Sequence, residues 1–211
     1  MRGCSHLIGV IDYKAGNAPS VVNALRRLNI ACQLVSTPEQ LRNFSGVILP
    51  GVGSAPATVE SLAELGFIPE LETLVLEKKL PFLGICVGMQ ILFEHSEERD
   101  TTCLGWLKGT VRRFPKELRV PQIGWNKVNF RANHCFNHGI NKSEYFYFVN
   151  SYYAAPESEE IILGTTEYGL EFCAVIASEN IHATQFHVEK SGIVGLKMLQ
   201  NFAAIVGDKS C

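Results

Sequence analysis

Short apolar runs alternate with amphipathic stretches along the first half of the chain. The runs at 7–11, 31–35, 46–49 and 81–85 have the length of buried strands. From Ser20 onward one helical stripe carries Val21, Ala24, Leu25 and Leu28, and further helical patterns cover 57–65, 68–79 and 87–95. Strands separated by helices predict βαβ units and a mainly parallel sheet with helices on both faces.

The second half has a different pattern. Strand-like segments with few helical signals between them occur at 110–114, 127–130, 145–149, 161–166, 172–177 and 182–185. A closing helix from about Ser191 places Leu199, Phe202, Ala203 and Val206 on its inner stripe. We therefore expect an α/β fold with three layers, in which a mainly parallel central sheet has an antiparallel extension, within a single domain over residues 1–211.

Composition narrows the class of protein. A formal net charge of -2 gives no electrostatic reason to expect nucleic acid or an anionic membrane as a partner. No stretch approaches the ~18 apolar residues of a membrane span. The seven cysteines are scattered without a CxxC pair, which argues against a disulfide scaffold or a zinc site and favours a reducing cytoplasm.

Cys86 is the best candidate for a nucleophile. It stands in Gly84-Ile85-Cys86-Val87-Gly88, where a buried strand should turn sharply into a helix. Small residues two positions before and after a nucleophile avoid clashes on such a strained turn. The free N–H groups of a helix start also favour a thiolate. This context favours a nucleophile over the alternative, a buried core cysteine flanked by packing glycines.

A cysteine nucleophile needs a base and a group that orients it. His187 follows the apolar run 181–186, and Glu189 comes two residues later. In an extended segment both side chains project from the same side, so the carboxylate can hold one imidazole nitrogen while the other faces a thiol. The alternative is a histidine at the rim of the protein beside a solvated acid, and the spacing leaves both open.

A metal site has little support. His134 and His138 have i,i+4 spacing, which on a helix could bind a metal. They lie in a loop-like stretch without an obvious third ligand. We expect no metal and no cofactor.

Further motifs extend over nearly the whole chain. They are Ile11-Asp12-Tyr13 with Gly16-Asn17, Leu49-Pro50-Gly51-Val52-Gly53, residues 83–90, Gly124-Trp125-Asn126, residues 147–152 and residues 185–191. With these motifs the chain resembles class I, triad-type glutamine amidotransferases. The elbow and the His-x-Glu are specific for that class. Pro-Gly-Val-Gly and Gly-Trp-Asn narrow the resemblance to subunits that supply ammonia to a (β/α)8-barrel cyclase in histidine biosynthesis, or to close paralogues.

The resemblance implies a role for each matching residue. Cys86, His187 and Glu189 would form the triad of a glutaminase. Gly51, Val52 and the amide of Val87 would form an oxyanion hole. Glutamine would be bound by Gln90, by Glu98 at its α-ammonium group, and by the backbone of Ser151 and Tyr152. The alternatives are a helix-surface amide for Gln90 and a solvated charge run for Glu98.

A partner subunit is implied as well. The family forms a heterodimer with the barrel cyclase, and Trp125, Asn126 and Lys190 match positions near that interface. The alternative is a tryptophan packed in the core beside two surface polar residues. Departures from the family pattern lie at Ser54-Ala55, Gln122, Asn150 and Val188. They put the identity of the partner in question more than the chemistry of the triad.

Three other functions compete. A paralogous glutaminase would supply ammonia for acetamidino-sugar biosynthesis. A different cysteine-elbow enzyme, such as a peptidase or a deglycase-like protein, need not have His-x-Glu after a late strand. A non-catalytic module would often have lost one of the three triad residues.

Overall fold

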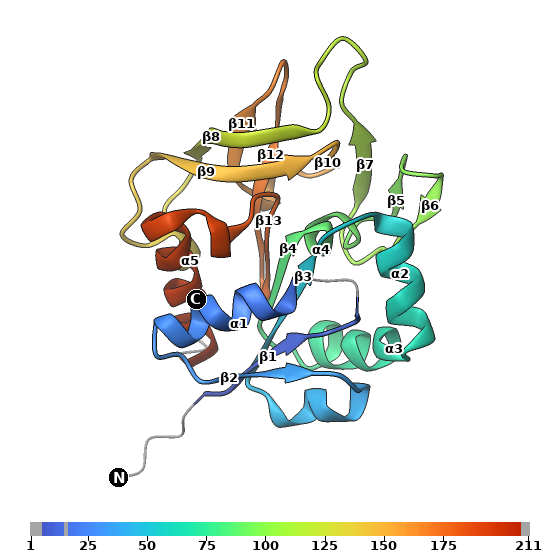
Figure 1. Ribbon diagram of the computed structural model, residues 1–211, viewed down its shortest axis with the longest axis vertical. Helices are drawn as coiled ribbons and strands as arrows, with labels where there is room; N and C mark the ends of the chain where they lie inside the picture. The colour runs from blue at the N-terminus through green and yellow to red at the C-terminus, as the bar shows by residue number, and fades with distance from the viewer. Residues whose placement is uncertain (1–5, 15–16, 208–211) are drawn as a thin grey trace.

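The computed structural model describes residues 6–14 and 17–207 and is built around one mixed sheet (Figure 1). Gly16 of the first motif lies outside the described residues. The parallel half has the order β2-β1-β3-β4-β13, formed by Cys32–Val35, Ile8–Ile11, Gly46–Gly51, Phe82–Cys86 and Ile181–Thr184. Every residue of β1, β3, β4 and β13 is buried. Strands that helices cover on both faces have this pattern.

Beyond β13 the sheet continues mainly through antiparallel pairs, as predicted, and one short pair near its far edge, residues 95–96 with 110–111, is parallel. The main path runs through β12 (Glu171–Ser178), β10 (Tyr152–Pro156), β7 (Gly109–Arg113), β5 (His95–Ser96) and β6 (Thr101–Thr102). A branch leaves β12 through β11 (Ile162–Glu167) to β8 (Gln122–Phe130) and β9 (Ser143–Asn150). The predicted segments 127–130 and 145–149 are parts of the longer β8 and β9, and β10, β5 and β6 were not predicted.

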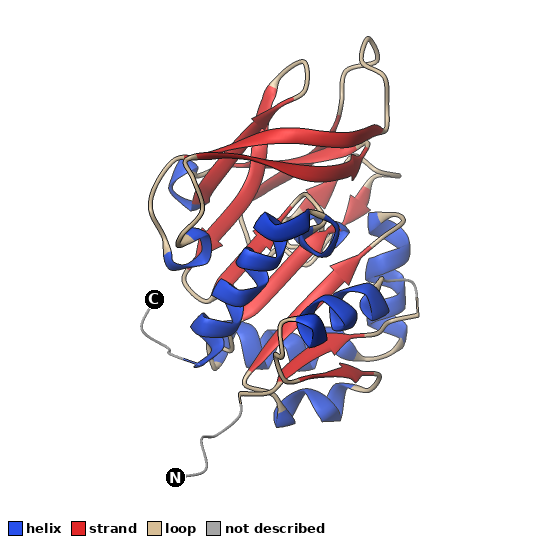
Figure 2. Ribbon diagram, turned by 60° about the vertical axis from the view of Figure 1, so that its left-hand side comes forward, coloured by secondary structure: helices blue, strands red, loops and turns tan. Residues whose placement is uncertain are grey.

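Helices cover both faces of the parallel half and complete the three layers (Figures 1 and 2). One face carries α1 (Ala18–Arg27) and α5 (Gly192–Gly207). The other carries α2 (Ala55–Glu64) and α3 (Phe67–Leu71), which continues as the π-helix η2 (Glu72–Glu77). The 3-10 turns are η1 (Pro38–Asn43), η3 (Cys135–Asn137), η4 (Glu159–Ile161) and η5 (Val188–Lys190). Within the described residues, no helix is long and apolar enough to cross a membrane.

The helix predicted over 87–95 is wrong in its extent, because α4 covers only Val87–Gln90. The apolar residues that follow are buried, so the pattern did mark core positions. Their carbonyls, however, accept hydrogen bonds from a later loop: Leu104 donates to Ile91, Leu107 to Leu92 and Gly105 to Phe93. Because these carbonyl groups find their hydrogen-bond partners outside a helix, α4 ends after one turn.

His182 is a fully buried titratable group on β13. Its ring lies among Phe136, His134 and Phe202, and neither ring nitrogen makes a hydrogen bond of good geometry to the described part of the chain. Burial, with a smaller contribution from His134, lowers the pKa of His182 from 6.5 to about 4. Folding therefore favours the neutral ring. Stability is unaffected above pH 6.5 and falls as the pH drops from 6.5 toward 4, because the unfolded chain binds the proton that the folded core resists.

We expect the free energy of unfolding of the parent protein to fall by about 2 kcal/mol between pH 7.5 and pH 5 because of this group. In His182→Phe most of that pH-dependent fall should be absent. Urea unfolding at the two pH values measures it, and the pH difference separates titration from any packing cost of the larger ring. The exposed His138 provides the control, since His138→Gln should keep the parent's pH sensitivity. An equal loss in His182→Phe would contradict the assignment.

Candidate active site

Cys86 ends β4 and begins α4 on a strained turn, as the elbow motif predicted. Its φ of 56° and ψ of -109° lie in a region that non-glycine residues rarely adopt. The side chain is only 4% exposed. The four-residue α4 is a shorter helix than expected, so its dipole contributes less to the thiol environment than a long helix would.

The flanking glycines are required by close backbone contact. A Cβ added at Gly84 would lie 2.5 Å from the carbonyl oxygen of Gly88, and one added at Gly88 would lie 2.1 Å from that of Leu49. A Cβ at Gly51 would lie 2.4 Å from the nitrogen of Gly88. Strands β3 and β4 therefore approach α4 at distances that only glycine permits.

Sheet topology brings the remaining groups to the same edge. Gly51 is the register partner of Cys86 across β3 and β4, and Thr184 of β13 is the partner of Ile85. The segments after β3 and β13 therefore leave the sheet beside the nucleophile. The carboxyl ends of neighbouring parallel strands are the usual place for a site in such folds.

The structure brings Cys86, His187 and Glu189 together in one buried group. Cys86 and His187 line the same cavity and interact electrostatically, and Nδ1 of His187 lies 2.9 Å from Oε1 of Glu189. The side chains of His187 and Glu189 are 4% and 2% exposed, which contradicts the alternative of a rim histidine beside a solvated acid. Burial opposes a charge on His187, but the interactions with Cys86 and Glu189 outweigh it and raise the pKa of His187 to about 10.

The local backbone differs from the extended segment that we expected around His187. His187 is the last extended residue, and Val188–Lys190 forms the single turn η5. The backbone N–H of His187 donates to the carbonyl of Tyr147 on β9, and Ser191 Oγ donates to the His187 carbonyl at 2.7 Å. These bonds hold the turn, and the turn places Glu189 against the ring of His187.

Asn17 supports the carboxylate and was missing from our predicted site. Its Nδ2 donates to Oε1 of Glu189 at 3.3 Å, and Ser20 Oγ donates to Asn17 Oδ1 at 2.7 Å. Asn17 belongs to the first motif, so motif membership was a signal for it. The contact joins residues 172 positions apart, which spacing along the chain does not show.

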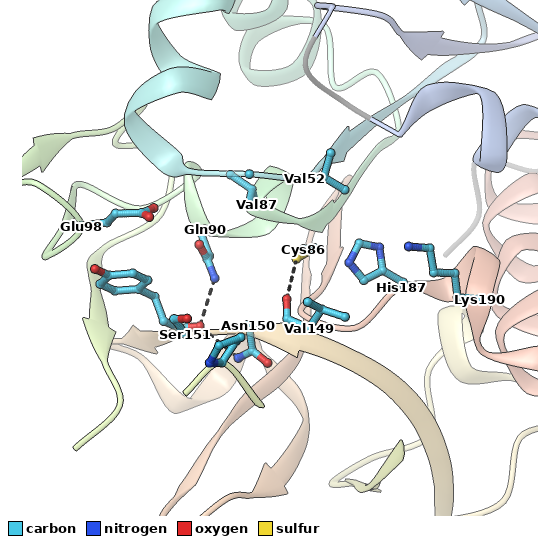
Figure 3. A pocket seen from close by; sticks show the side chains of 13 residues that line it. Val52, Cys86, Val87, Gln90, Glu98, Val149, Asn150, Ser151, His187 and Lys190 are labelled. Carbon is cyan, nitrogen blue, oxygen red and sulfur yellow. Dashed lines mark hydrogen bonds between the residues drawn. The ribbon is translucent and has the colours of Figure 1, made fainter. Parts of the chain in front are cut away.

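A cavity of about 280 Å³ opens beside Cys86 (Figure 3). It is lined by the predicted substrate-binding residues Gln90, Glu98, Ser151 and Tyr152, together with Val52, Val87, His187 and Lys190. Gln90 is 4% exposed, so the alternative of a helix-surface amide is wrong. Glu98 is half-buried, and its Oε2 accepts a hydrogen bond of 2.8 Å from the N–H of Ala55 at the start of α2.

The three residues predicted for an oxyanion hole lie around the nucleophile. Val52 and Val87 line the cavity, and Gly51 packs against the Val87–Gly88 backbone. Amide groups on two sides of Cys86 could therefore face one oxygen atom. Their role in stabilising an oxyanion stays a prediction.

The three predicted interface residues lie in different settings. Trp125 is 57% exposed, which contradicts a tryptophan packed in the core. Lys190 is exposed at the cavity rim. Asn126 alternates to the opposite side of β8 from Trp125, where its Nδ2 donates to the Glu167 carbonyl. Asn126 therefore supports the β8–β11 pair from behind the Trp125 face.

Two of the residues that depart from the family pattern lie next to each other on adjacent strands. Gln122 and Asn150 are register partners in β8 and β9, and both are buried. Asn150 Nδ2 donates to the Tyr152 carbonyl at 3.0 Å. Val188 is fully buried in η5, and the departure at Ser54-Ala55 leaves the backbone N–H that Glu98 uses intact. None of these departures displaces a triad residue.

A second group of side chains has ligand atoms close together. Those of His134, Cys135 and His182 all lie within 4.8 Å of one another. His138, which has i,i+4 spacing from His134, is exposed and is not part of this group. Cys135 is disulfide-bonded, so its sulfur does not offer a thiolate. We therefore assign no metal to the group.

Comparisons with known proteins give a consistent result. The family model described as glutamine amidotransferase class-I matches residues 9–206. The imidazole glycerol phosphate synthase subunit HisH of Dehalococcoides mccartyi (strain ATCC BAA-2266) is 46% identical over 205 residues, covering 96% of this chain and 100% of the relative. The HisH subunit of Herpetosiphon aurantiacus is 45% identical, with coverage of 97% and 100%.

Solved structures show the same fold at low identity. A glutamine amidotransferase crystal structure superposes with a TM-score of 0.76 at 21% identity, covering 95% of this chain and 99% of the other. The PurLQS structure from Thermotoga maritima gives 0.75 at 18% identity, with coverage of 95% and 98%. The agreement covers both the parallel half of the sheet and its antiparallel extension.

Proposed function

The chain belongs to the class-I glutamine amidotransferase family, and we propose that it is the glutaminase subunit of an imidazole glycerol phosphate synthase, acting in histidine biosynthesis. The observation that carries the proposal is that Cys86 and His187 line one cavity of about 280 Å³, with Glu189 hydrogen-bonded to His187 behind them. Relatives named as HisH subunits match nearly the whole chain, which favours this pathway over acetamidino-sugar biosynthesis. We also propose that residues 1–211 form one amidotransferase domain and that the protein acts in the cytoplasm.

The proposed reaction begins at the sulfur of Cys86. Its thiolate attacks the side-chain carboxamide carbon of glutamine, and a C–S bond forms while the carbonyl π electrons move to oxygen. Protonated His187 gives its proton to the departing nitrogen, so ammonia leaves and a thioester remains. Neutral His187 then takes a proton from water, which attacks the thioester carbon. Glutamate is released and Cys86 is restored.

The surrounding residues stabilise the charges that form in the reaction and bind the substrate. Glu189 accepts from His187 and stabilises its charged form, and Asn17 holds the carboxylate. The amides of Val52 and Val87 would stabilise the oxyanion, where one donor is typically worth about 3 kcal/mol. Glu98, at the far end of the cavity, would receive the α-ammonium group of glutamine.

A partner is supported by the exposed apolar surface next to the cavity. The structure describes five exposed large apolar side chains, and four lie around β8, β9 and the start of α5: Ile123, Trp125, Tyr145 and Ile193. The outward positions of β8 and β9 continue to Val149, which lines the cavity. An apolar surface of this kind marks a protein interface. We propose that the (β/α)8-barrel cyclase binds here as a heterodimer and receives the ammonia.

Mixing the chain with the cyclase subunit from the same source tests the proposal. We expect low glutamate release from the isolated chain and a strong rise when the cyclase and its ligand are present. Trp125→Ala should weaken the complex by about 30-fold or more, as expected for a tryptophan at the centre of an interface. Titration calorimetry measures the affinity, and a glutamate assay measures the activation.

Leu34→Ala provides the matched control, because Leu34 is also exposed but lies on the edge strand β2. That variant should bind the cyclase like the parent. No binding of the cyclase, together with co-purification of an acetamidino-sugar enzyme from the native cell, would rule out the histidine pathway. Equal weakening by both variants would rule out the Trp125 face.

A further inference from the structure

Gln185 reaches the nucleophile from the end of β13. Its side chain is fully buried, and its Nε2 lies 3.7 Å from Sγ of Cys86, within the distance of a hydrogen bond to sulfur. The backbone N–H of Gln185 donates to the Ala174 carbonyl at 2.9 Å, which fixes the start of the side chain. None of the steps proposed for glutamine hydrolysis uses this amide.

The orientation of the Gln185 amide follows from its neighbours. Gln90 Nε2 lies 3.0 Å from the carbonyl oxygen of Tyr152 and 3.0 Å from Oε1 of Gln185. A backbone carbonyl can only accept, so Gln90 must present its NH2 group to Tyr152. The same NH2 group then requires the oxygen of Gln185 on its other side. The NH2 group of Gln185 is left to face Cys86.

The direction of the hydrogen bond decides which form of the sulfur it favours. An N–H donor stabilises a thiolate, and an acceptor stabilises a thiol. Cys86 has one contact of each kind, because the Val149 carbonyl lies 3.7 Å from Sγ and accepts from the thiol (Figure 3). The N–H group of Gln185 favours the thiolate, whereas the Val149 carbonyl favours the thiol.

We propose that Gln185 is a further catalytic residue, which stabilises the thiolate of Cys86 by an N–H···S hydrogen bond, and that Gln90 positions it. The proposal deepens the proposed glutaminase function and rests on Cys86 being its nucleophile. The titratable groups around the sulfur, which the variants below leave in place, are Tyr13, Glu98, His187, Glu189 and Lys190.

The rate of alkylation of Cys86 by iodoacetamide tests the proposal without requiring glutaminase turnover, because the thiolate is the reacting form. Peptide mass spectrometry on the full chain follows Cys86 separately, with the free Cys32 and Cys103 as internal controls. In Gln185→Met the donor is lost and the side-chain length is kept. We expect alkylation of Cys86 at pH 7 to slow about tenfold, the size of one charge-assisted hydrogen bond.

Gln185→Glu is the sharper variant. One carboxylate oxygen can still accept from Gln90, and the other places negative charge against the sulfur. We expect a larger loss than in Gln185→Met at pH 7. In both variants the difference from the parent should narrow above pH 9.5, where a free thiol is largely ionised. A purely structural defect would change the labelling of Cys32 and Cys103 as well. The difference in rate between variant and parent would then persist at high pH.

Gln90→Glu provides a second route if the buried Gln185 variants fail to fold. A carboxylate at position 90 attracts the NH2 group of Gln185 and turns its oxygen toward Cys86, so alkylation should again slow about tenfold. Rates within twofold of the parent in every variant that folds would overturn the proposal. A Gln185-dependent rate in a chain that releases no glutamate, even with the cyclase, would keep this inference and remove the proposed glutaminase function.

Discussion

Cys86→Ala should abolish glutamate release and leave ammonia-dependent synthesis by the cyclase complex intact. The first half follows because Cys86 carries the only sulfur among the described residues that line the cavity, and it lies there beside His187. Losing a triad nucleophile removes the covalent route, and we expect a fall on the order of 10⁴-fold or more in kcat. The second half follows because added ammonia bypasses the glutaminase and reaches the cyclase from solution.

The variant should be assayed as the assembled complex, with glutamine and with ammonium chloride at alkaline pH in parallel. Cys103→Ala makes the same chemical change at a half-buried, free thiol and should retain full glutaminase activity. Burial raises the pKa of Cys103 to about 11, so that sulfur is not a reactive thiolate at neutral pH. Glutamate release by Cys86→Ala near the parent's rate would transfer the nucleophile to another residue.

The features that the sequence predicted well depend on short-range patterns. The elbow is defined by five consecutive residues, and the structure places Cys86 at a positive φ between two glycines in close contact. The parallel half of the sheet follows from apolar runs bounded by turns. His187 and Glu189 are two residues apart, so one turn suffices to join them, although that turn is η5 and not an extended strand.

What the sequence left open depends on contacts between distant segments. The bond from Ala55 to Glu98 spans 43 positions, and it brings a residue from a charged run into the cavity. The bond between Gln90 and Gln185 spans 95 positions and determines which end of an amide faces the nucleophile. The early end of α4 also has a tertiary cause, since the carbonyls of residues 91–93, which follow it, accept hydrogen bonds from the loop at 104–107. A pattern along the chain shows that such residues are buried but does not show which groups they meet.

Gly88→Ala should prevent stable folding or cost at least about 3 kcal/mol of stability. An alanine in a helix normally stabilises relative to glycine by about 0.5–1 kcal/mol. Gly88 lies in α4 with an ordinary φ, so local propensity predicts a gain. The added Cβ would lie 2.1 Å from the carbonyl oxygen of Leu49, where two backbone segments meet and neither can move as a side chain would.

Gly105→Ala separates this cause from the general cost of replacing glycine. Gly105 has a φ of 67°, and no atom lies within 4 Å of an added Cβ, so its replacement should cost only about 1 kcal/mol of backbone strain. Urea unfolding of the two variants measures the difference, and similar losses in both would contradict the close contact at Gly88. If Gly88→Ala does fold, β3 must separate from α4, and the amides of Val52 and Val87 must move apart. Glutaminase activity should then fall even in the fraction that is folded, because the contact that only glycine permits is also the one that holds the two predicted oxyanion donors beside Cys86.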